Sequence, residues 1–549
     1  MNHPTGSAKL QTKVNLTKDQ LNAFQRIKVF LQDPNEPAIV IKGSAGTGKS
    51  FLTKYMTDYI VSKLHMNIVA VAPTHKARRV MHKFLNKDRF IPIPTITVAS
   101  VLSKMREHSY IGSHRYSAGS TQKMDNYDCI IIDEISMVSD EDLDILIDYI
   151  CEHDKKLIMI GDDCQIPAPS QKIVRDGYIC YKPDSDAFNI ANLCELNEII
   201  RQAKGSPIIT LATYIRDNIA EAVSIQDIFN STGVDPDEIC LKTEFLYEEV
   251  AKDIRDGKST RVISYTNAAV RNHNNEIRKV LGYKNPFVEG ELLTGYNNVG
   301  FPVPVIENGS DYRVIKTQKT DNFNVMSFGG LSGYLLTLQD TEDLDTVSER
   351  LFFISVKDPK NSTFMKELVK LAEKVNKNRS TKNDFKEYCK LKNRVICIDD
   401  VYKYENKIMT DTELKQLHPL LFTRVMEVID DKSRDKLDTE LADKIDEIYE
   451  HLILDRIRDN KMFGDGEVFA DRFKVVEKDI YYGYSVTGHK CQGSTYQSVY
   501  VDEQDFKKLA NKWNYRHRAL ENRYKEQNQL KYVAYTRASE KLRIFMPEW

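Results

Sequence analysis

The sequence predicts an α/β protein whose parallel sheets are covered by helices on both faces. Two observations predict this fold class. Short apolar runs typical of buried strands alternate with helical spacing in residues 1–205, and a second set of the same kind occupies 206–290 and 478–549. In residues 291–477 this alternation stops, which indicates a domain inserted into the second set.

The individual elements can be placed from their residues. Leu16–Phe30 has helical spacing, and Thr17 is a suitable N-cap for that helix. A second helix is expected at Ala268–Leu281. Buried strands are expected at 38–41, 68–72, 129–132 and 157–160 in the first set, and at 261–265, 498–501 and 542–545 in the second.

Composition narrows the class of protein. A chain of 549 residues corresponds to about three to four domains. With 41% hydrophobic and 29% charged residues, it is neither collagen-like nor wholly disordered. The formal net charge of −2 excludes a uniformly basic, histone-type protein. It does not exclude a nucleic-acid partner, because charge can be segregated over a surface.

The sequence carries no sign of a metal-binding cysteine pair or of a membrane span. The nine cysteines are scattered singly, without a C-x-x-C pair, which argues against a zinc ribbon. No apolar run approaches the roughly 18 to 20 residues of a membrane helix. The polar start MNHPTGSAKLQ lacks an apolar signal segment. We therefore expect a cytoplasmic protein with no membrane partner.

Residues 43–50, GSAGTGKS, match the phosphate-binding pattern G-x-x-x-x-G-K-[ST] in full. The motif lies between an apolar strand and a helical segment at Phe51–Lys63, as a P-loop requires. Lys49 is expected to reach the β- and γ-phosphates of ATP, and Ser50 to ligate Mg²⁺. The backbone N–H groups expected to surround the phosphates belong to Gly43, Ser44, Ala45, Gly46, Thr47 and Gly48.

An apolar strand that ends in two acids favours hydrolysis of the nucleotide. Ile130–Ile132 leads directly into Asp133 and Glu134. We expect Asp133 beside the P-loop, where it can hold Mg²⁺, and Glu134 as the general base for the attacking water. A small-molecule kinase stays open as an alternative, but it would need a site for a second substrate.

Three further residues are candidates for contact with the γ-phosphate. Gln165 follows the next strand, within Gly161–Pro167. Arg201 and Arg537 lie in short patterned contexts, Leu196–Gln202 and Tyr535–Ala538. A guanidinium can bind γ-phosphate oxygens and the charge that develops on them, so both are candidate arginine fingers.

Taken in order along the chain, these motifs resemble those of superfamily 1 helicases. The form His489–Gly493, HKCQG, is most similar to the Dda and RecD branch, superfamily 1B. The segments that carry the resemblance are Leu16–Gln20, the P-loop, Ala72–His75, Asp133–Glu134, Gly161–Gln165, Arg201–Gln202, Tyr265–Asn267, Thr487–Gly493 and Tyr532–Arg537.

The resemblance implies two RecA-like P-loop domains with ATP between them. Gln20 would read the adenine, and Arg537 would reach across from the second domain. The implied activity is an ATP-dependent DNA helicase that moves 5′ to 3′ on single-stranded DNA and separates duplex strands. Two alternatives stay open: a translocase subunit of a RecD-like recombination or repair complex, stimulated by single-stranded DNA, and a UvrD-like 3′ to 5′ helicase.

The same resemblance suggests a path for the DNA strand. The residues expected on it lie in loops at strand ends and carry hydroxyls, amides and basic groups, which suit phosphate and sugar contacts. They are Pro73, Thr74, His75, Thr97, Ser100, Asn267, Thr487, His489 and Lys490. Each Thr or Ser could equally be an ordinary helix cap or turn.

Two inserts complete the expected organisation. An alternating stretch with a Gly-Ser turn, within about 89–125, predicts a hairpin. In Dda-like enzymes such a hairpin is the strand-separating pin, and Tyr110, Ile111 and Tyr116 are the candidate tip residues. In the second domain, residues 291–358 resemble a Src-homology-3-like β unit, and 361–460 are expected to form a helical extension.

Expected partners follow from the implied activity. They are single-stranded DNA, fork and duplex junctions, and possible single-strand-binding or other replication and recombination proteins. A monomer is expected to suffice for function, and a phage origin fits the Dda likeness.

Overall fold

The computed structural model divides the chain into two compact units. Unit 1 consists of Met1–Leu102, Thr121–Arg175 and Tyr181–Ser206, and unit 2 of Ser103–Ser120, Asp176–Cys180 and Pro207–Trp549. The structure describes residues 16–87, 89–102, 105–108, 114–117, 124–168, 172–175, 178–181, 184–200, 206–296, 306–325, 328–344, 346–348, 351–354, 359–361, 363, 474–475, 480–511 and 520–546.

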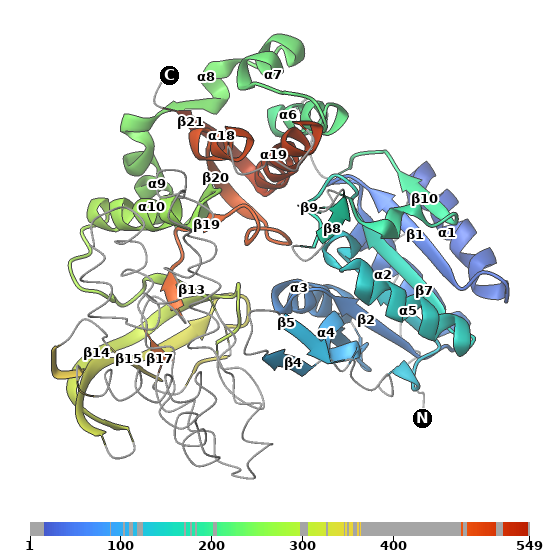
Figure 1. Cartoon of the computed structure of the whole chain (residues 1–549), viewed down its shortest axis with the longest axis horizontal. Helices are drawn as coiled ribbons and strands as arrows, with labels where there is room; N and C mark the ends of the chain where they lie inside the picture. The colour runs from blue at the N-terminus through green and yellow to red at the C-terminus, as the bar shows by residue number, and fades with distance from the viewer. Residues whose placement is uncertain are drawn as a thin grey trace, which may run out of the picture. The chain divides into compact units, whose positions relative to one another are not determined.

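Unit 1 is built on a parallel sheet (Figure 1). Across the sheet the strands are β10 (Leu193–Leu196), β1 (Ala38–Gly43), β7 (Lys156–Gly161), β6 (Cys129–Ile132), β2 (Ile68–Ala72) and β3 (Thr95–Thr97). All neighbouring pairs are parallel. The predicted fold class is confirmed. The short strands β3 and β10 were not predicted, because their sequences, TIT and LCEL, are not continuous apolar runs.

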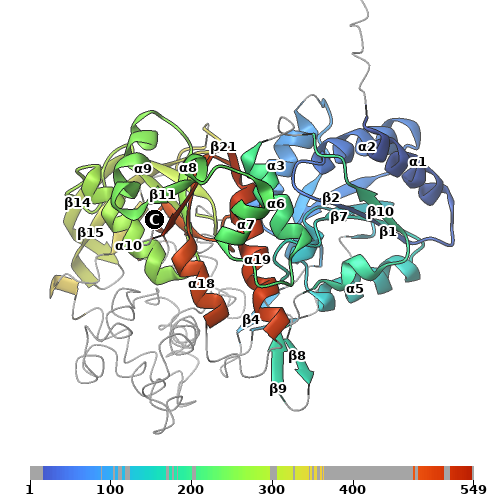
Figure 2. The ribbon, with the colours of Figure 1, turned by 90° about the horizontal axis from the view of Figure 1, so that it is seen from above.

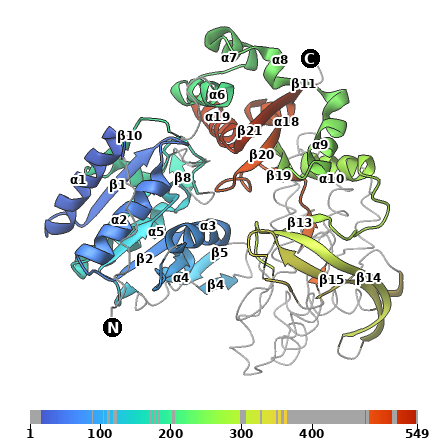
Figure 3. The same ribbon diagram turned by 180° about the vertical axis from the view of Figure 1, so that it is seen from behind.

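Helices cover both faces of this sheet (Figures 1 and 3). On one face, α1 (Lys18–Gln32), α2 (Lys49–Lys63) and α3 (His75–Asn86) pack on strand residues such as Ile39 and Ile41. On the other face, α4 (Val98–Val101) and α5 (Asp140–Glu152) pack on Val40 and its neighbours. Side chains of a strand alternate between faces, so burial on both sides requires the near-continuous apolar runs seen in the sequence.

Unit 2 contains a second parallel sheet. Its strands lie in the order β11 (Cys240–Lys242), β21 (Ala538–Met546), β20 (Tyr496–Asp502), β12 (Thr260–Ser264) and β19 (Ser485–Thr487). Helices α9 (Leu246–Arg255) and α10 (Asn267–Val280) share a core with one face. Helices α18 (Glu503–Asn511) and α19 (Leu520–Thr536) pack against β20 and β21.

Several short elements complete the two units. Helix α6 (Pro207–Asp217) packs against α19 and α7 (Ile225–Thr232), as Figure 2 shows, and α8 (Pro236–Ile239) precedes β11. The 3₁₀ turns are η2 (Ile135–Met137), η3 (Asp186–Asn189), η4 (Thr243–Phe245) and η5 (Pro359–Asn361). Within the described residues, no helix has both the length and the apolar character that a membrane crossing needs.

An antiparallel sheet is inserted between α10 and β19. Its order is β17 (Lys474–Val475), β16 (Leu351–Ile354), β15 (Phe328–Asp340), β14 (Asp311–Val325), β13 (Leu292–Gly295) and β18 (Ile480–Tyr482), with only β16 and β17 parallel. Its apolar core includes Phe287, Val314 and Phe353. The alternating runs in 291–358 predicted this antiparallel pairing. Apart from residues 361 and 363, the helical extension expected at 361–460 lies outside the described residues.

Two hairpins stand apart from the large sheets. Strands β4 (Met105–His108) and β5 (His114–Ser117) pair antiparallel, as the alternating stretch predicts. This hairpin lies between β3 and β6 in sequence, yet its residues group with unit 2 and not with unit 1. A second pair, β8 (Lys172–Arg175) and β9 (Tyr178–Tyr181), was not predicted.

Buried ion pairs join the inserted sheet to the parallel sheet of unit 2. Arg261 on β12 lies 2.7 Å from a carboxylate oxygen of Asp311 on β14, with side chains only 4% and 9% exposed. The hydroxyl of Thr294 donates to the other oxygen of Asp311 at 2.6 Å. Arg278 on α10 pairs with the buried Glu291 at 2.5 Å. Each charge is therefore compensated where water cannot reach it.

We expect Asp311→Ala to destabilise unit 2 by about 3–5 kcal/mol, because it leaves the buried Arg261 guanidinium without its carboxylate. Urea unfolding followed by circular dichroism measures the effect. Asp321→Ala is the matched control, because Asp321 forms an exposed pair with Lys360 and should leave the urea midpoint unchanged. Equal midpoints for both variants would contradict a structural role for the buried pair.

Candidate functional site

The motif residues of unit 1 gather at one edge of its sheet. In a parallel sheet every strand ends at the same edge, so loops that are far apart in sequence become neighbours. The P-loop follows β1, Gly161 ends β7, and Asp133 follows β6. Further along the same edge, Pro73–His75 follows β2 and Thr97 ends β3. The nucleotide motifs thus occupy one half of the edge, and the predicted DNA contacts occupy the other.

The P-loop has the backbone geometry of a phosphate cradle. Gly46 and Gly48 adopt left-handed conformations, with φ of 85° and 77°, which glycine permits without steric cost. The Lys49 ammonium donates to the carbonyl oxygens of Gly43 at 2.8 Å and Ser44 at 3.0 Å. Helix α2 begins at Lys49, so its N-terminal N–H groups and its dipole favour an anion at this loop.

Gln20 braces the P-loop from α1. Its side chain is only 1% exposed. The amide nitrogen donates to the carbonyl oxygens of Thr47 at 3.2 Å and Gly48 at 3.4 Å. The amide oxygen accepts from the backbone N–H of Thr17 at 3.1 Å, which completes the capping box of α1. The cap at Thr17 is confirmed, whereas adenine recognition by Gln20 stays a prediction.

The chain that follows β10 also supports the P-loop. The backbone N–H of Ile200 donates to the carbonyl oxygen of Gly46 at 2.8 Å. A side chain at Gly43 would meet the Thr47 hydroxyl at 2.7 Å and Leu196 at 3.0 Å, so only glycine fits between β1 and β10. Arg201, the first candidate arginine finger, follows Ile200 directly but lies outside the described residues.

Glu134 combines a rare backbone conformation with a carboxylate oxygen that has no hydrogen-bond partner among the described residues. Its φ of 54° places a non-glycine residue in the left-handed region, where strain often marks functional sites. Its Oε2 atom is buried and accepts no hydrogen bond from the described residues. An oxygen that lacks a partner in the protein can bind the proton of an attacking water.

Asp133 precedes Glu134 and lies within the electrostatic reach of the P-loop. Burial, reinforced by the charge of Glu134, raises the pKa of Asp133 to about 7, while the ammonium of Lys49 and the N–H of Glu134 oppose this shift. The backbone N–H of Asp133 donates to Val71 at 3.0 Å. Together with the hydroxyl of Ser50, this carboxylate supplies the hard oxygen ligands that Mg²⁺ prefers, so the residues fit the predicted ion.

Gln165 is fixed by the turn that follows β7. It is 3% exposed, and its backbone N–H donates to the carbonyl oxygen of Asp162 at 3.2 Å. The Asp162 carboxylate in turn accepts from the N–H of Cys164 at 3.2 Å. A side chain at Gly161 would meet Ile135 at 2.8 Å, which explains why glycine ends this strand.

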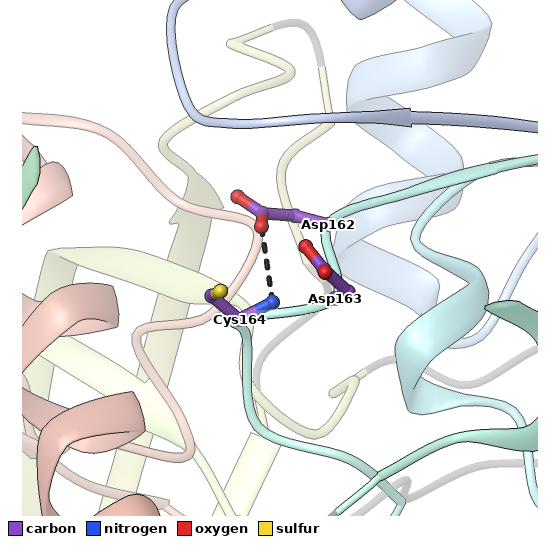
Figure 4. A group of neighbouring side chains, drawn as sticks. All are labelled: Asp162, Asp163 and Cys164. Atoms are coloured by element: carbon purple, nitrogen blue, oxygen red, sulfur yellow. Dashed lines mark hydrogen bonds between the residues drawn. The ribbon is translucent and has the colours of Figure 1, made fainter. Parts of the chain in front are cut away.

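The same turn brings three possible metal ligands together. Oxygen and sulfur atoms of Asp162, Asp163 and Cys164 lie within 4.8 Å of one another (Figure 4). However, Asp163 pairs with Lys42 at 3.1 Å, and Lys42 also pairs with Glu195 at 3.1 Å. Asp162 already accepts from the backbone, so these contacts stabilise the turn. We assign the group a structural role.

The predicted DNA-contacting hydroxyls of unit 1 serve as helix caps. The Thr74 hydroxyl accepts from the N–H of Ala77 at 3.1 Å and caps α3. The Thr97 hydroxyl accepts from the N–H of Ser100 at 3.2 Å and caps α4. These local bonds explain the residue types without any ligand, and contact with DNA stays a prediction for Pro73, His75 and Ser100 as well.

In unit 2, Asn267 is held by a residue that the sequence did not suggest. Asn267 is the exposed first residue of α10. The carboxylate of Asp505 on α18 accepts from the N–H groups of Tyr265 at 2.9 Å and Thr266 at 2.7 Å. This carboxylate fixes the turn that presents Asn267 at the carboxyl end of β12. Asp505 lies in no recognised motif, so only its position in the fold reveals its role.

The loop Thr487–Gly493 starts at the neighbouring strand end. The N–H of Gly488 donates to the carbonyl oxygen of Ser264 on β12 at 2.9 Å, which places the loop beside the Asn267 turn. The Thr487 hydroxyl accepts from the N–H of Lys490 at 3.3 Å, and His489 is exposed. The Lys490 ammonium lies 3.2 Å from the ring centroid of Tyr296, a contact that the sequence did not suggest.

Arg537 lies at the opposite end of this sheet, where β21 begins. It is 7% exposed. Its guanidinium donates to the carbonyl oxygens of Val533 and Ser494, both at 3.1 Å, and to the hydroxyl of Thr536 at 3.2 Å. Arg537 therefore contacts Ser494, which lies just after the loop that carries Lys490. Its role as an arginine finger stays a prediction.

The candidate pin residues can be placed only along the backbone. Tyr116 belongs to β5, opposite Arg106 on β4. Tyr110 and Ile111 lie outside the described residues. The hairpin itself is therefore observed, and the strand-separating role stays a prediction.

Comparisons with known proteins indicate which proteins this chain resembles. A family model described as an AAA domain matches residues 15–228. The ATP-dependent DNA helicase dda of Enterobacteria phage T4 is 27% identical over 360 residues, which cover 62% of this chain and 77% of that protein. An uncharacterized protein of Acanthamoeba polyphaga mimivirus is 25% identical over 523 residues, which cover 90% of this chain and 95% of that protein.

Solved structures of similar proteins include helicases. The crystal structure of Pif1 helicase from Candida albicans has a TM-score of 0.45 and 14% identity, covering 97% of this chain and 94% of that chain. The structure of Bacteroides Pif1 with ADP-AlF3 and ssDNA has a TM-score of 0.42 and 14% identity, covering 97% and 92%. The AAA domain and the T4 relative agree with the ordered motifs, and they confirm the resemblance to superfamily 1B, Dda-like helicases.

We expect Gly48→Ala to abolish tight ATP binding, because the added methyl group collides with the Gln20 amide and the left-handed backbone is strained. Nucleotide binding measured with a fluorescent ATP analogue tests this. Gly233→Ala is the matched control: Gly233 has φ of 68° but open space around it. The control should lose about 1 kcal/mol of stability and keep nucleotide affinity. Normal affinity in Gly48→Ala would contradict the packing of Gln20 on the P-loop.

Proposed function

We propose that this chain is an ATP-hydrolysing DNA helicase that moves 5′ to 3′ on single-stranded DNA and separates duplex strands. The observation that carries the proposal is Oε2 of the half-buried Glu134, which has no hydrogen-bond partner among the described residues. Glu134 follows Asp133 at the sheet edge that also holds the P-loop. The phosphate cradle, a possible metal ligand and a general base belong to one edge, which is what ATP hydrolysis requires.

The nucleotide is proposed to bind between two motor domains, residues 1–205 and residues 206–290 with 478–549. The P-loop N–H groups and Lys49 bind the phosphates, and Glu134 takes a proton from the attacking water. Gln165 orients this water. Ser50 and Asp133 would hold Mg²⁺, which would supply positive charge that offsets the charge of the phosphates. Gln20 keeps the P-loop in its binding conformation.

Arginines connect nucleotide state to movement in this proposal. Arg537 and Arg201 would bind the γ-phosphate from outside the P-loop. ATP can favour a closed arrangement of the domains only if it binds that arrangement more tightly, and an arginine supplied across the cleft provides the difference. Arg537 donates to Ser494, at the end of the loop that begins at Thr487. This loop offers a short physical link from the nucleotide to Lys490.

The DNA strand is proposed to cross the other half of the unit 1 edge and the β12–β19 end of unit 2. The exposed amide of Asn267, together with His489 and Lys490, suits backbone contacts without base readout. The hairpin β4–β5 would then separate the strands at a fork. The direction of movement rests on the family resemblance alone.

Alternative functions make different demands on the chain. A RecD-like subunit would hydrolyse ATP on single-stranded DNA but would need a partner to unwind duplex DNA. A UvrD-like enzyme would move 3′ to 5′. A small-molecule kinase would show no stimulation by DNA. The Oε2 atom of Glu134, which has no hydrogen-bond partner among the described residues, favours water over a second substrate as the acceptor of the phosphoryl group.

We expect Glu134→Gln to lower kcat for ATP hydrolysis by at least about 100-fold, because an amide cannot accept the proton of the attacking water. ATP affinity should change little, since the P-loop is intact. Lys49→Ala should lose both turnover and tight binding. Steady-state ATPase assays with single-stranded DNA measure these effects. Glu141→Gln, an exposed residue of α5, should behave as wild type. Wild-type turnover in Glu134→Gln would contradict the assigned base.

We expect forked duplexes with only a 5′ single-stranded tail to be unwound in the presence of ATP, and duplexes with only a 3′ tail to persist. Strand release from a fluorophore–quencher pair measures both reactions. Glu134→Gln should release neither strand, which controls for passive melting. Release from the 3′-tailed substrate would instead favour the UvrD-like alternative, and ATPase stimulation without release would favour the RecD-like alternative.

A further inference from the structure

Tyr296 connects the inserted sheet to the loop that is expected to contact DNA. Tyr296 directly follows β13, an inserted strand, whereas Lys490 belongs to the Thr487–Gly493 loop of the parallel sheet. The Lys490 ammonium lies over the Tyr296 ring, 3.2 Å from its centroid. Lysine and tyrosine thus come from two different sheets of unit 2.

The Tyr296 ring has a defined position because its neighbours hold it. The Tyr481 ring on β18 packs against it at 6.3 Å between centroids, with the planes 84° apart. Strand β18 pairs with β13 through Tyr481 and Thr294. The Thr294 hydroxyl is bonded to Asp311, which pairs with Arg261 of the parallel sheet. The ring is therefore connected to the parallel sheet through a buried network of contacts.

The contact between ring and ammonium has a chemical consequence. An aromatic face attracts a cation electrostatically, and the attraction strengthens when the pair is partly buried. A lysine ammonium has three N–H donors, and the ring occupies only one side of it. The ammonium keeps its charge over the ring, and that charge attracts a phosphate group. Because a lysine side chain otherwise samples many rotamers, holding it reduces the entropy lost when it binds a ligand.

We propose that Tyr296 is a positioning residue that holds the Lys490 ammonium ready to bind a backbone phosphate of single-stranded DNA. The inserted sheet thereby contributes to DNA binding through a motor loop. This inference rests on the proposed function, because it takes a DNA strand to be the ligand of Lys490. A competing role is direct stacking of the Tyr296 ring on a base, which is common in single-strand-binding grooves.

The experiment measures binding of fluorescently labelled oligothymidylate to the full chain by fluorescence anisotropy over a series of NaCl concentrations. The variants are Tyr296→Leu, Tyr296→Phe, Lys490→Ala and the double variant Tyr296→Leu/Lys490→Ala. Tyr283→Leu is the matched control, since Tyr283 is also a half-buried tyrosine beside a cation, Arg278, at 5.9 Å. Thermal unfolding verifies folding, and Tyr296→Met repeats the test if Tyr296→Leu melts early.

If Tyr296 positions Lys490, Tyr296→Leu and Lys490→Ala should each weaken DNA binding by about three- to tenfold. Each should also reduce, by about 0.7, the steepness with which the logarithm of the DNA association constant falls with the logarithm of the salt concentration. A change of this size corresponds to the loss of one phosphate contact to a single strand. The double variant should bind no more weakly than either single variant, since both remove one interaction. Tyr296→Phe and Tyr283→Leu should bind as wild type.

Other outcomes overturn the inference in distinguishable ways. Additive losses, with an unchanged salt slope in Tyr296→Leu, would show that the ring contacts DNA itself. Wild-type binding by Tyr296→Leu, or by Lys490→Ala, would show that the pair does not act on DNA, while the proposed helicase function would stand. Failure of the wild-type chain to bind oligothymidylate would reject the proposed function together with this inference.

Discussion

The parallel pairing of β1, β7 and β6 is the constraint on which the nucleotide site depends. Because parallel strands end at one edge, the P-loop, the Gln165 turn and the Asp133–Glu134 pair are held next to one another by backbone hydrogen bonds. The side chains then need only local support. Gln20 and Ile200 both donate hydrogen bonds to carbonyl oxygens of the P-loop, and the turn at Asp162 holds Gln165. Glu134 keeps a buried oxygen without a hydrogen-bond partner among the described residues, directly after Asp133 at this edge.

A second constraint governs unit 2, where an antiparallel sheet is inserted into a parallel one. Two sheets joined only by loops could move separately, but Arg261 and Arg278 each reach a carboxylate of the inserted segment. Desolvation makes such pairs poor sources of net stability, yet separating them would leave charges buried and unpaired. They therefore favour one arrangement of the sheets over others. In that arrangement the Tyr296 ring contacts the Lys490 ammonium. At the end of the Thr487–Ser494 loop, the carbonyl oxygen of Ser494 accepts a hydrogen bond from Arg537.

Sequence patterns predicted the parts of the molecule whose chemistry is local. Apolar runs indicated β1, β2, β6 and β7, and the strand positions agree with the structure within one or two residues. Capping by Thr17 was likewise predictable, because a helix cap and its N–H partner lie three residues apart. The hydroxyls of Thr74 and Thr97 show the limit of this reasoning, since the same residue type serves a cap or a ligand. Short strands such as β10 gave no readable period.

By itself, the sequence determined the nucleotide motifs, their order and the α/β class, because strand burial and phosphate binding each require particular residue types at close spacing. The tertiary structure alone decided which distant residues support these motifs. Asp505 holds the Asn267 turn across more than two hundred residues of chain, and Tyr296 reaches Lys490 from the inserted sheet. A carboxylate or an aromatic ring has many possible partners along a chain. The partner that such a side chain contacts depends on strand order and on buried charge pairing. Neither of these can be predicted from the local sequence.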